Sequence, residues 1–102
     1  MIIVNGRIET TAAAIAAVKD AVAAMETASR AEAGCHDYTF SVELNNPNVI
    51  RITERWDDMA ALEIHFKTPH MAEFQKAMAA NPPTSSAVHF YEATEVPRPG
   101  SR

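Results

Sequence analysis

The chain has 102 residues and a net charge of −4 at pH 7, and it is 47% hydrophobic and 22% charged. This length and composition predict a single globular domain. The acidic balance and the lack of a lysine and arginine cluster argue against a nucleic-acid partner, and no apolar run approaches the ~20 residues of a membrane span.

A single cysteine, Cys35, leaves no partner for an internal disulfide. This favours a reducing, cytoplasmic setting, and the short apolar start of the chain lacks the basic leader of a signal peptide. We expect one domain over residues 1–96 and a disordered tail over residues 97–102.

The first third of the chain predicts a strand and then a helix. Residues 1–9 are rich in isoleucine and valine, and Thr10 or Thr11 can cap the element that follows. Residues 12–32 are rich in alanine, and their apolar stripe lies on one helix face: Ile15, Val18, Val22 and Met25. This helix shows no chemistry, and Gly34 is typical of a helix end.

A hairpin is predicted next, with residues 45–48 as its turn. Alternation over residues 35–44 places one set of side chains on a common face: His36, Tyr38, Phe40, Val42 and Leu44. The same alternation over residues 49–56 groups Ile50, Ile52, Glu54 and Trp56.

An interrupted helix and a last strand complete the pattern. Asp57 or Asp58 can cap the helix, and Pro69 breaks or kinks it. Before the proline the buried stripe is Met59, Leu62 and Phe66, with His65 at its edge. After the proline the spacing groups His70, Phe74 and Met78. Residues 86–96 predict the last strand.

The order βαββαβ predicts an α+β ferredoxin-like fold, a four-stranded antiparallel sheet with two helices on one face. The other face would be open and half apolar, with Val49, Val88 and Phe90 beside arginines. Such a face in a small domain favours self-association, so we expect a homodimer packed sheet to sheet.

Three residues of the central stretch suggest chemistry. Trp56, the only tryptophan, is either a core anchor or a pocket wall that stacks a flat aromatic ligand. Glu54 shares its strand face, and a carboxylate aimed at a core needs a partner, either a structural one or a catalytic histidine that it orients. His65 is the leading general-base candidate, with a structural role as the alternative.

Further candidates are His70 for catalysis, and Tyr38, His36 and Asn5 for substrate binding. No metal is expected, because His65 and His70 are five residues apart with a proline between them, unlike the i, i+4 pair of a zinc helix. The sequence contains no nucleotide-binding motif, so no cofactor is expected.

Three motifs resemble the antibiotic biosynthesis monooxygenase family, especially its quinol monooxygenase branch. They are Gly34-Cys35-His36-Asp37-Tyr38, Glu54-Arg55-Trp56 and Leu62-x-x-His65-x-x-Thr68-Pro69-His70-Met71. The resemblance spans residues 1 to about 95 and implies a dimeric α/β barrel. It also implies a pocket between helices and sheet, lined by Tyr38, Glu54, Trp56, His65, Phe66, His70 and Phe74.

Two positions depart from related branches. Ile52 and Leu62 stand where the aromatic-polyketide oxygenases have an asparagine and a tyrosine, so their anthrone site is not expected. Phe74 stands nearest to the haem-ligating histidine of the haem-degrading members, so haem is not expected.

The resemblance implies a cofactor-free oxygenase acting on a quinol or polyhydroxylated aromatic and dioxygen. His65, steered by Glu54 or a neighbour, would remove a phenolic proton, and the anion would give an electron to dioxygen. Two alternatives stay open. One is an isomerase of the autoinducer-2 degradation type, which would use the same base on a small ketose-like phosphate. The other is a ligand-binding dimer without catalysis.

Overall fold

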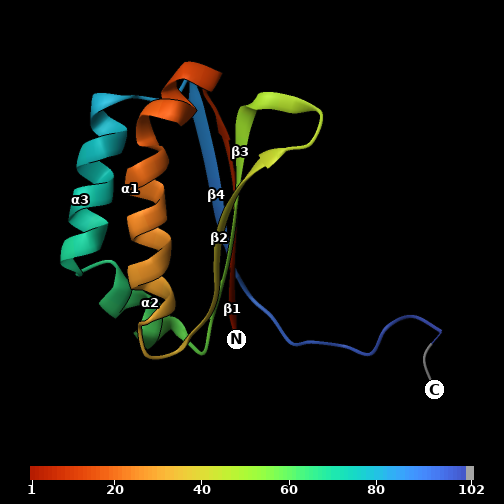
Figure 1. The fold of residues 1–102 in the computed structure, drawn as a ribbon. Coiled ribbons are helices and arrows are strands. Elements are labelled where there is room, and N and C mark those ends of the chain that lie inside the picture. The colour runs from red at the N-terminus through yellow and green to blue at the C-terminus, as the bar shows by residue number, and fades with distance from the viewer. Residues whose placement is uncertain (101–102) are drawn as a thin grey trace.

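The computed structural model of the protein describes residues 1–100. Its elements are, in order, β1 (Ile2–Glu9), α1 (Ala12–Arg30), β2 (Cys35–Glu43), β3 (Asn46–Trp56), α2 (Met59–His65), α3 (Pro69–Ala80) and β4 (Ser85–Glu92). The strands form one antiparallel sheet in the order β2-β3-β1-β4, and the helices lie on one of its faces (Figure 1). The predicted ferredoxin-like α+β fold is confirmed.

Local capping sets the starts and ends of the first two helices. The side chain of Thr11 accepts a hydrogen bond from the Ala14 amide at 3.1 Å, and Asp58 accepts one from the Ala61 amide at 2.9 Å. The chain leaves α1 at Arg30, and Gly34 in the following turn has a φ of +84°, which favours glycine. Glu32 therefore lies in this turn, whereas the sequence had placed it at the end of the helix.

The predicted second helix is two helices, because Thr68 and Pro69 start a new one. The Thr68 hydroxyl donates to the His65 carbonyl at 2.7 Å and also caps α3. In α2 the inward residues are Leu62 and His65, whereas Met59 and Phe66 are 46% and 47% exposed. The predicted buried stripe is right for Leu62 and wrong for Met59 and Phe66, because the short helix turns His65 toward the sheet.

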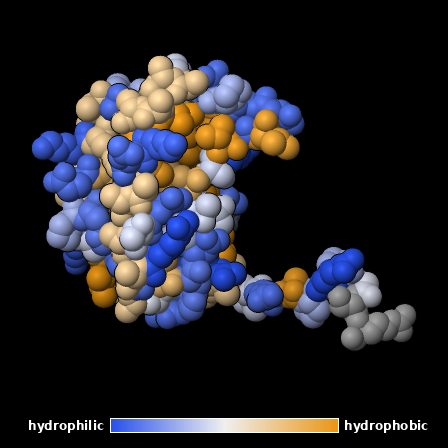
Figure 2. Space-filling model, viewed as in Figure 1, coloured by the Kyte–Doolittle hydropathy of each residue, from blue (hydrophilic) through white to orange (hydrophobic). Residues whose placement is uncertain are grey.

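The β2–β3 hairpin turns at residues 44–45, earlier than predicted, and Leu44 is exposed at its tip. Figure 2 shows hydrophobic and hydrophilic atoms next to one another at this end of the molecule. A β-bulge lies between Cys35 and Asp37, so that Cys35 pairs with Trp56 and Tyr38 with Glu54. Directly paired residues share a face, so Cys35 and not His36 points inward beside Tyr38. The prediction that His36 and Tyr38 share a face is therefore wrong.

The open face of the sheet lacks two of the apolar residues that the sequence had placed on it. Val88 and Phe90 pair with Gly6 and Val4, whose side of the sheet faces the helices, and Val49 is buried. On the open face Glu43 accepts from Arg7 Nε at 3.2 Å and from Arg51 Nε at 2.8 Å. The predicted apolar open face is thus wrong in its composition, and the sheet-to-sheet homodimer stays a prediction.

The C-terminal part of the chain leaves the sheet at Glu92, four residues earlier than predicted. Residues 93–98 have no regular structure, and this segment runs away from the body of the domain (Figure 1). Residues 101–102 of the predicted disordered tail lie outside the described residues, and the disorder stays a prediction. Among residues 1–100 no helix is long and apolar enough to cross a membrane.

Candidate functional site

An aromatic cluster forms between the helices and the sheet. β3 contributes Trp56, β2 contributes Tyr38, and α2 contributes His65; their exposed fractions are 0%, 2% and 0%. The ring centroid of His65 lies 4.8 Å from that of Trp56 and 5.2 Å from that of Tyr38. Three of the predicted site residues, distant along the chain, therefore lie together in the core.

Glu54 lies in the same core, but its partner is not a histidine. Its Oε1 accepts a hydrogen bond from the indole Nε1 of Trp56 at 2.9 Å. Burial raises the pKa of Glu54 to about 7, and the hydrogen bond from Trp56 opposes this shift. The expectation that Glu54 orients the catalytic histidine is corrected, because its bonded partner is its own strand neighbour on that face.

Glu32 takes the role that the sequence had suggested for Glu54. Its Oε2 lies 2.6 Å from Nδ1 of His65 and 2.8 Å from Nε2 of His70. The break between α2 and α3 brings both rings to this carboxylate, with centroids 5.9 Å apart. One feature of the sequence pointed to Glu32. It is an acidic residue two positions before Gly34, where the first of the three motifs begins.

The contact with Glu32 determines which nitrogen of His65 is free. An ionised carboxylate only accepts hydrogen bonds, so Nδ1 of His65 carries the hydrogen and donates it to Glu32. The other nitrogen, Nε2, is then a bare lone pair, and it is buried without a hydrogen-bond partner. A buried polar atom without a partner costs about 1–3 kcal/mol, and in native proteins such an atom calls for an explanation, which can be functional.

Burial also affects the two other polar groups of this core. It raises the pKa of the Tyr38 hydroxyl, with a further contribution from the carboxylate of Glu54, so the hydroxyl stays protonated. It likewise raises the pKa of the Cys35 thiol, with the nearby charge of Glu32 adding to the shift. Burial therefore favours the protonated form of both groups at neutral pH.

The predicted open pocket around these residues is wrong for this structure. Trp56 and His65 are fully buried and Glu54 is 8% exposed, and the four best-formed cavities among residues 1–100 do not include these three residues. A groove of about 660 Å³ between α1 and α3 is lined by His70 and Phe74, two of the predicted pocket residues. The groove thus brings solvent to His70 at the edge of the cluster.

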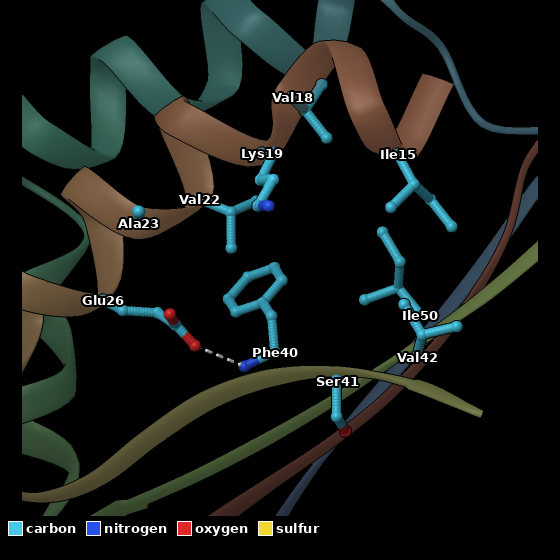
Figure 3. Close-up of a pocket in the computed structure, with 10 residues that line it drawn as sticks. All are labelled: Ile15, Val18, Lys19, Val22, Ala23, Glu26, Phe40, Ser41, Val42 and Ile50. Atoms are coloured by element: carbon cyan, nitrogen blue, oxygen red, sulfur yellow. Dashed lines mark hydrogen bonds between the residues drawn. The ribbon is translucent and has the colours of Figure 1, made fainter. Parts of the chain in front are cut away.

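A second cavity, of about 310 Å³, lies between α1 and the β2–β3 hairpin (Figure 3). Phe40 points from β2 toward Val22 of α1, and the Phe40 amide donates to Glu26 at 2.9 Å. The lining is otherwise almost wholly apolar and includes none of the predicted catalytic residues. Its polar lining residues are Lys19, Glu26 and Ser41, and it contains no histidine.

Three predicted site residues lie outside the buried cluster. His36 is on the surface, where its Nε2 pairs with Asp57. Asn5 is exposed on the open face, opposite Thr53, so it is separated from His65 by the sheet. Phe66 is exposed, although its ring centroid is 5.7 Å from that of His65. His36 lies on the surface because of the β-bulge in β2. Asn5 lies on the open face because alternate residues of β1 point to opposite faces of the sheet.

The sheet order and the buried His65–Glu32 pair define a ferredoxin-like domain with a histidine site beneath its helices. The model of the antibiotic biosynthesis monooxygenase family matches residues 1–77, and the chain belongs to this family. A crystal structure of a Deinococcus radiodurans protein named for the same family superposes with a TM-score of 0.86 at 28% identity, over 96% of this chain and 97% of that one.

Two curated relatives match in part. The "Probable quinol monooxygenase YgiN" of Escherichia coli is 34% identical over 55 residues, which cover 46% of this chain and 53% of YgiN. The "Uncharacterized protein sll1783" of Synechocystis is 41% identical over 46 residues, 45% of this chain and 31% of that protein. The matches therefore span about half or less of these relatives' length.

Proposed function

We propose that this protein is a cofactor-independent monooxygenase that oxidises a quinol or polyhydroxylated aromatic with dioxygen, with His65 as the base. The observation that carries the proposal is that Nε2 of His65 is buried without a hydrogen-bond partner, whereas Nδ1 lies 2.6 Å from Glu32. Family membership and the similarity to YgiN support the class of reaction and substrate.

His65 Nε2 would accept a phenolic proton, which leaves an electron-rich anion. The anion gives one electron to dioxygen, and the resulting radical pair recombines to form a peroxide with a new carbon–oxygen bond. The peroxide takes up a proton and loses water as its O–O bond breaks, so one oxygen atom stays on the ring, which is left oxidised to a quinone. The protein's part is to remove the proton, to hold the ring and to exclude water, which a buried base beside Trp56 and Tyr38 can do.

The captured proton needs a way out, since the His65 side chain has no exposed surface. Glu32 bridges His65 to His70, whose side chain is 23% exposed. A proton moving from Nδ1 of His65 through Glu32 to His70 would reach the groove between α1 and α3. Glu32 and His70 are therefore proposed as the path that resets the base.

The same groove is the proposed route for the substrate. Its volume of about 660 Å³ lies within the range of small-molecule sites, ~300–1,000 Å³. Phe74 lines the groove and packs against the core, with its ring 5.3 Å from that of Phe40. Substrate binding next to His65 then requires Phe74 to move aside, because the interior is closed.

The isomerase alternative has less support from this geometry. A ketose-like phosphate needs cationic partners, whereas the acids Glu32 and Glu54 lie closest to the aromatic cluster. Like charges this close disfavour an anionic substrate in a core of low dielectric constant. A hydroquinone enters without charge, and its anion forms only as His65 takes the proton and becomes positively charged.

Oxygen consumption with a panel of hydroquinones tests the proposal. We expect uptake that scales with the concentration of the full chain, for at least one member of the panel. The matched control is His89→Ala, since His89 is exposed on β4 opposite Asn5, and this variant should consume oxygen at the wild-type rate. Absence of uptake with every hydroquinone would contradict the proposal and favour the isomerase or the ligand-binding dimer.

A further inference from the structure

We propose that Glu32, His65 and His70 form a binding site for one divalent transition-metal ion, for which Zn²⁺ is the natural probe. The potential ligand atoms of these three residues all lie within 4.8 Å of one another. Two imidazoles and one carboxylate make up a known three-ligand set for zinc, with a fourth position left for water or a substrate. The inference does not depend on the proposed oxygenase activity.

The present geometry is close to that of an occupied site. The two histidine nitrogens lie 2.6 and 2.8 Å from the same oxygen of Glu32. Around an ion with ligand distances of about 2.0–2.2 Å, neighbouring ligand atoms are roughly 3–3.5 Å apart. The two contacts with Glu32 would therefore lengthen by less than about 1 Å, and ligand atoms that now lie up to 4.8 Å apart would draw together to this spacing. Each imidazole would then carry its hydrogen on the nitrogen that does not bind the ion.

Burial and charge also favour an ion here. Glu32 and His70 are 13% and 23% exposed, which gives an ion a way in, whereas His65 is fully buried behind them. The second oxygen of Glu32, Oε1, is buried without a hydrogen-bond partner and is available as a further ligand atom. A cation would thus compensate a partly buried carboxylate whose present partners include no lysine or arginine among the described residues.

An ion on Nδ1 of His65 has a consequence for the other ring nitrogen. A neutral imidazole that binds a metal through one nitrogen carries its hydrogen on the other. Nε2 of His65 would then be a donor and no longer a bare lone pair. The ion-bound state and the proton-accepting state of His65 therefore exclude each other.

Calorimetric titration with Zn²⁺ tests the site on the untagged full chain after dialysis against a chelator. We expect one ion per chain in the wild type and in His89→Ala, which removes an exposed histidine outside the cluster. Glu32→Gln and His70→Ala should bind at least about 10-fold more weakly, because each removes one ligand. His70→Ala changes a partly exposed side chain, so it remains informative if Glu32→Gln fails to fold.

Visible absorption of the Co²⁺-loaded protein gives a second readout that should appear in the wild type and vanish in His70→Ala. The proposal is overturned if the wild type binds no ion, if both cluster variants bind as tightly as the wild type, or if His89→Ala abolishes binding. These titrations need no quinol, so their failure and the failure of the oxygen-uptake assay are separate results.

Discussion

His65→Ala should lower the protein-dependent oxygen uptake by about 10²–10⁴-fold, the range that a positioned general base contributes. The loss follows from removing Nε2, the buried lone pair in the aromatic cluster, while Glu32 and His70 stay in place. Initial rates at a saturating hydroquinone concentration measure the effect, with His89→Ala as the matched control.

Because His65→Ala leaves a cavity in the core, His65→Gln should be measured beside it, since glutamine fills more of the space but is not a base. Circular dichroism checks that both variants are folded. Uptake that is unchanged in both folded variants would remove His65 from the mechanism. Loss of uptake in His70→Ala alone would assign the base to His70.

Glu54→Gln should remove a pH dependence from the stability of the fold. Glu54 has a pKa of about 7 in the folded chain because of its burial, against a reference value of 4.5. A raised pKa means that the folded state binds the proton more tightly. The resulting stability is fully present below pH 4.5 and is lost as the pH rises to about 7.

The difference between the two pKa values corresponds to about 3 kcal/mol. Glutamine cannot ionise, yet its carbonyl oxygen can still accept from the indole of Trp56. At pH 8 the variant should therefore be more stable than the wild type by up to about 3 kcal/mol, and at pH 4 by little. Urea denaturation at several pH values measures this, and a gain that is equal at pH 4 and pH 8 would contradict the assignment.

Much of the fold follows from local patterns in the sequence. The alternation of β3 correctly placed Glu54 and Trp56 on one face, and the caps at Thr11 and Asp58 were visible as side chains before apolar runs. These features depend on neighbouring residues only. The bulge at His36 was not predictable in this way, because one extra residue in a strand leaves the alternation pattern apparently intact.

The site was only half predictable, for a related reason. Strand parity predicted that Trp56 and Glu54 point to the same face, whereas helix spacing placed His65 only at the edge of the buried stripe, and the structure buries it fully. The bond from His65 to Glu32 joins residues 33 positions apart, and it depends on where α1 ends and how α2 turns. The closure of the interior depends on how side chains from six elements pack together, and the periodicity of the sequence does not predict this packing.

The central claim is that Glu32 holds His65 with a bare Nε2, and nitrogen-15 NMR of the histidine rings tests it most directly. In the neutral ring of His65 we predict hydrogen on Nδ1 and none on Nε2, and in Glu32→Gln a mixture of both forms. A wild-type spectrum with the hydrogen of His65 on Nε2 would contradict the account, because no buried lone pair would then be available to take a proton.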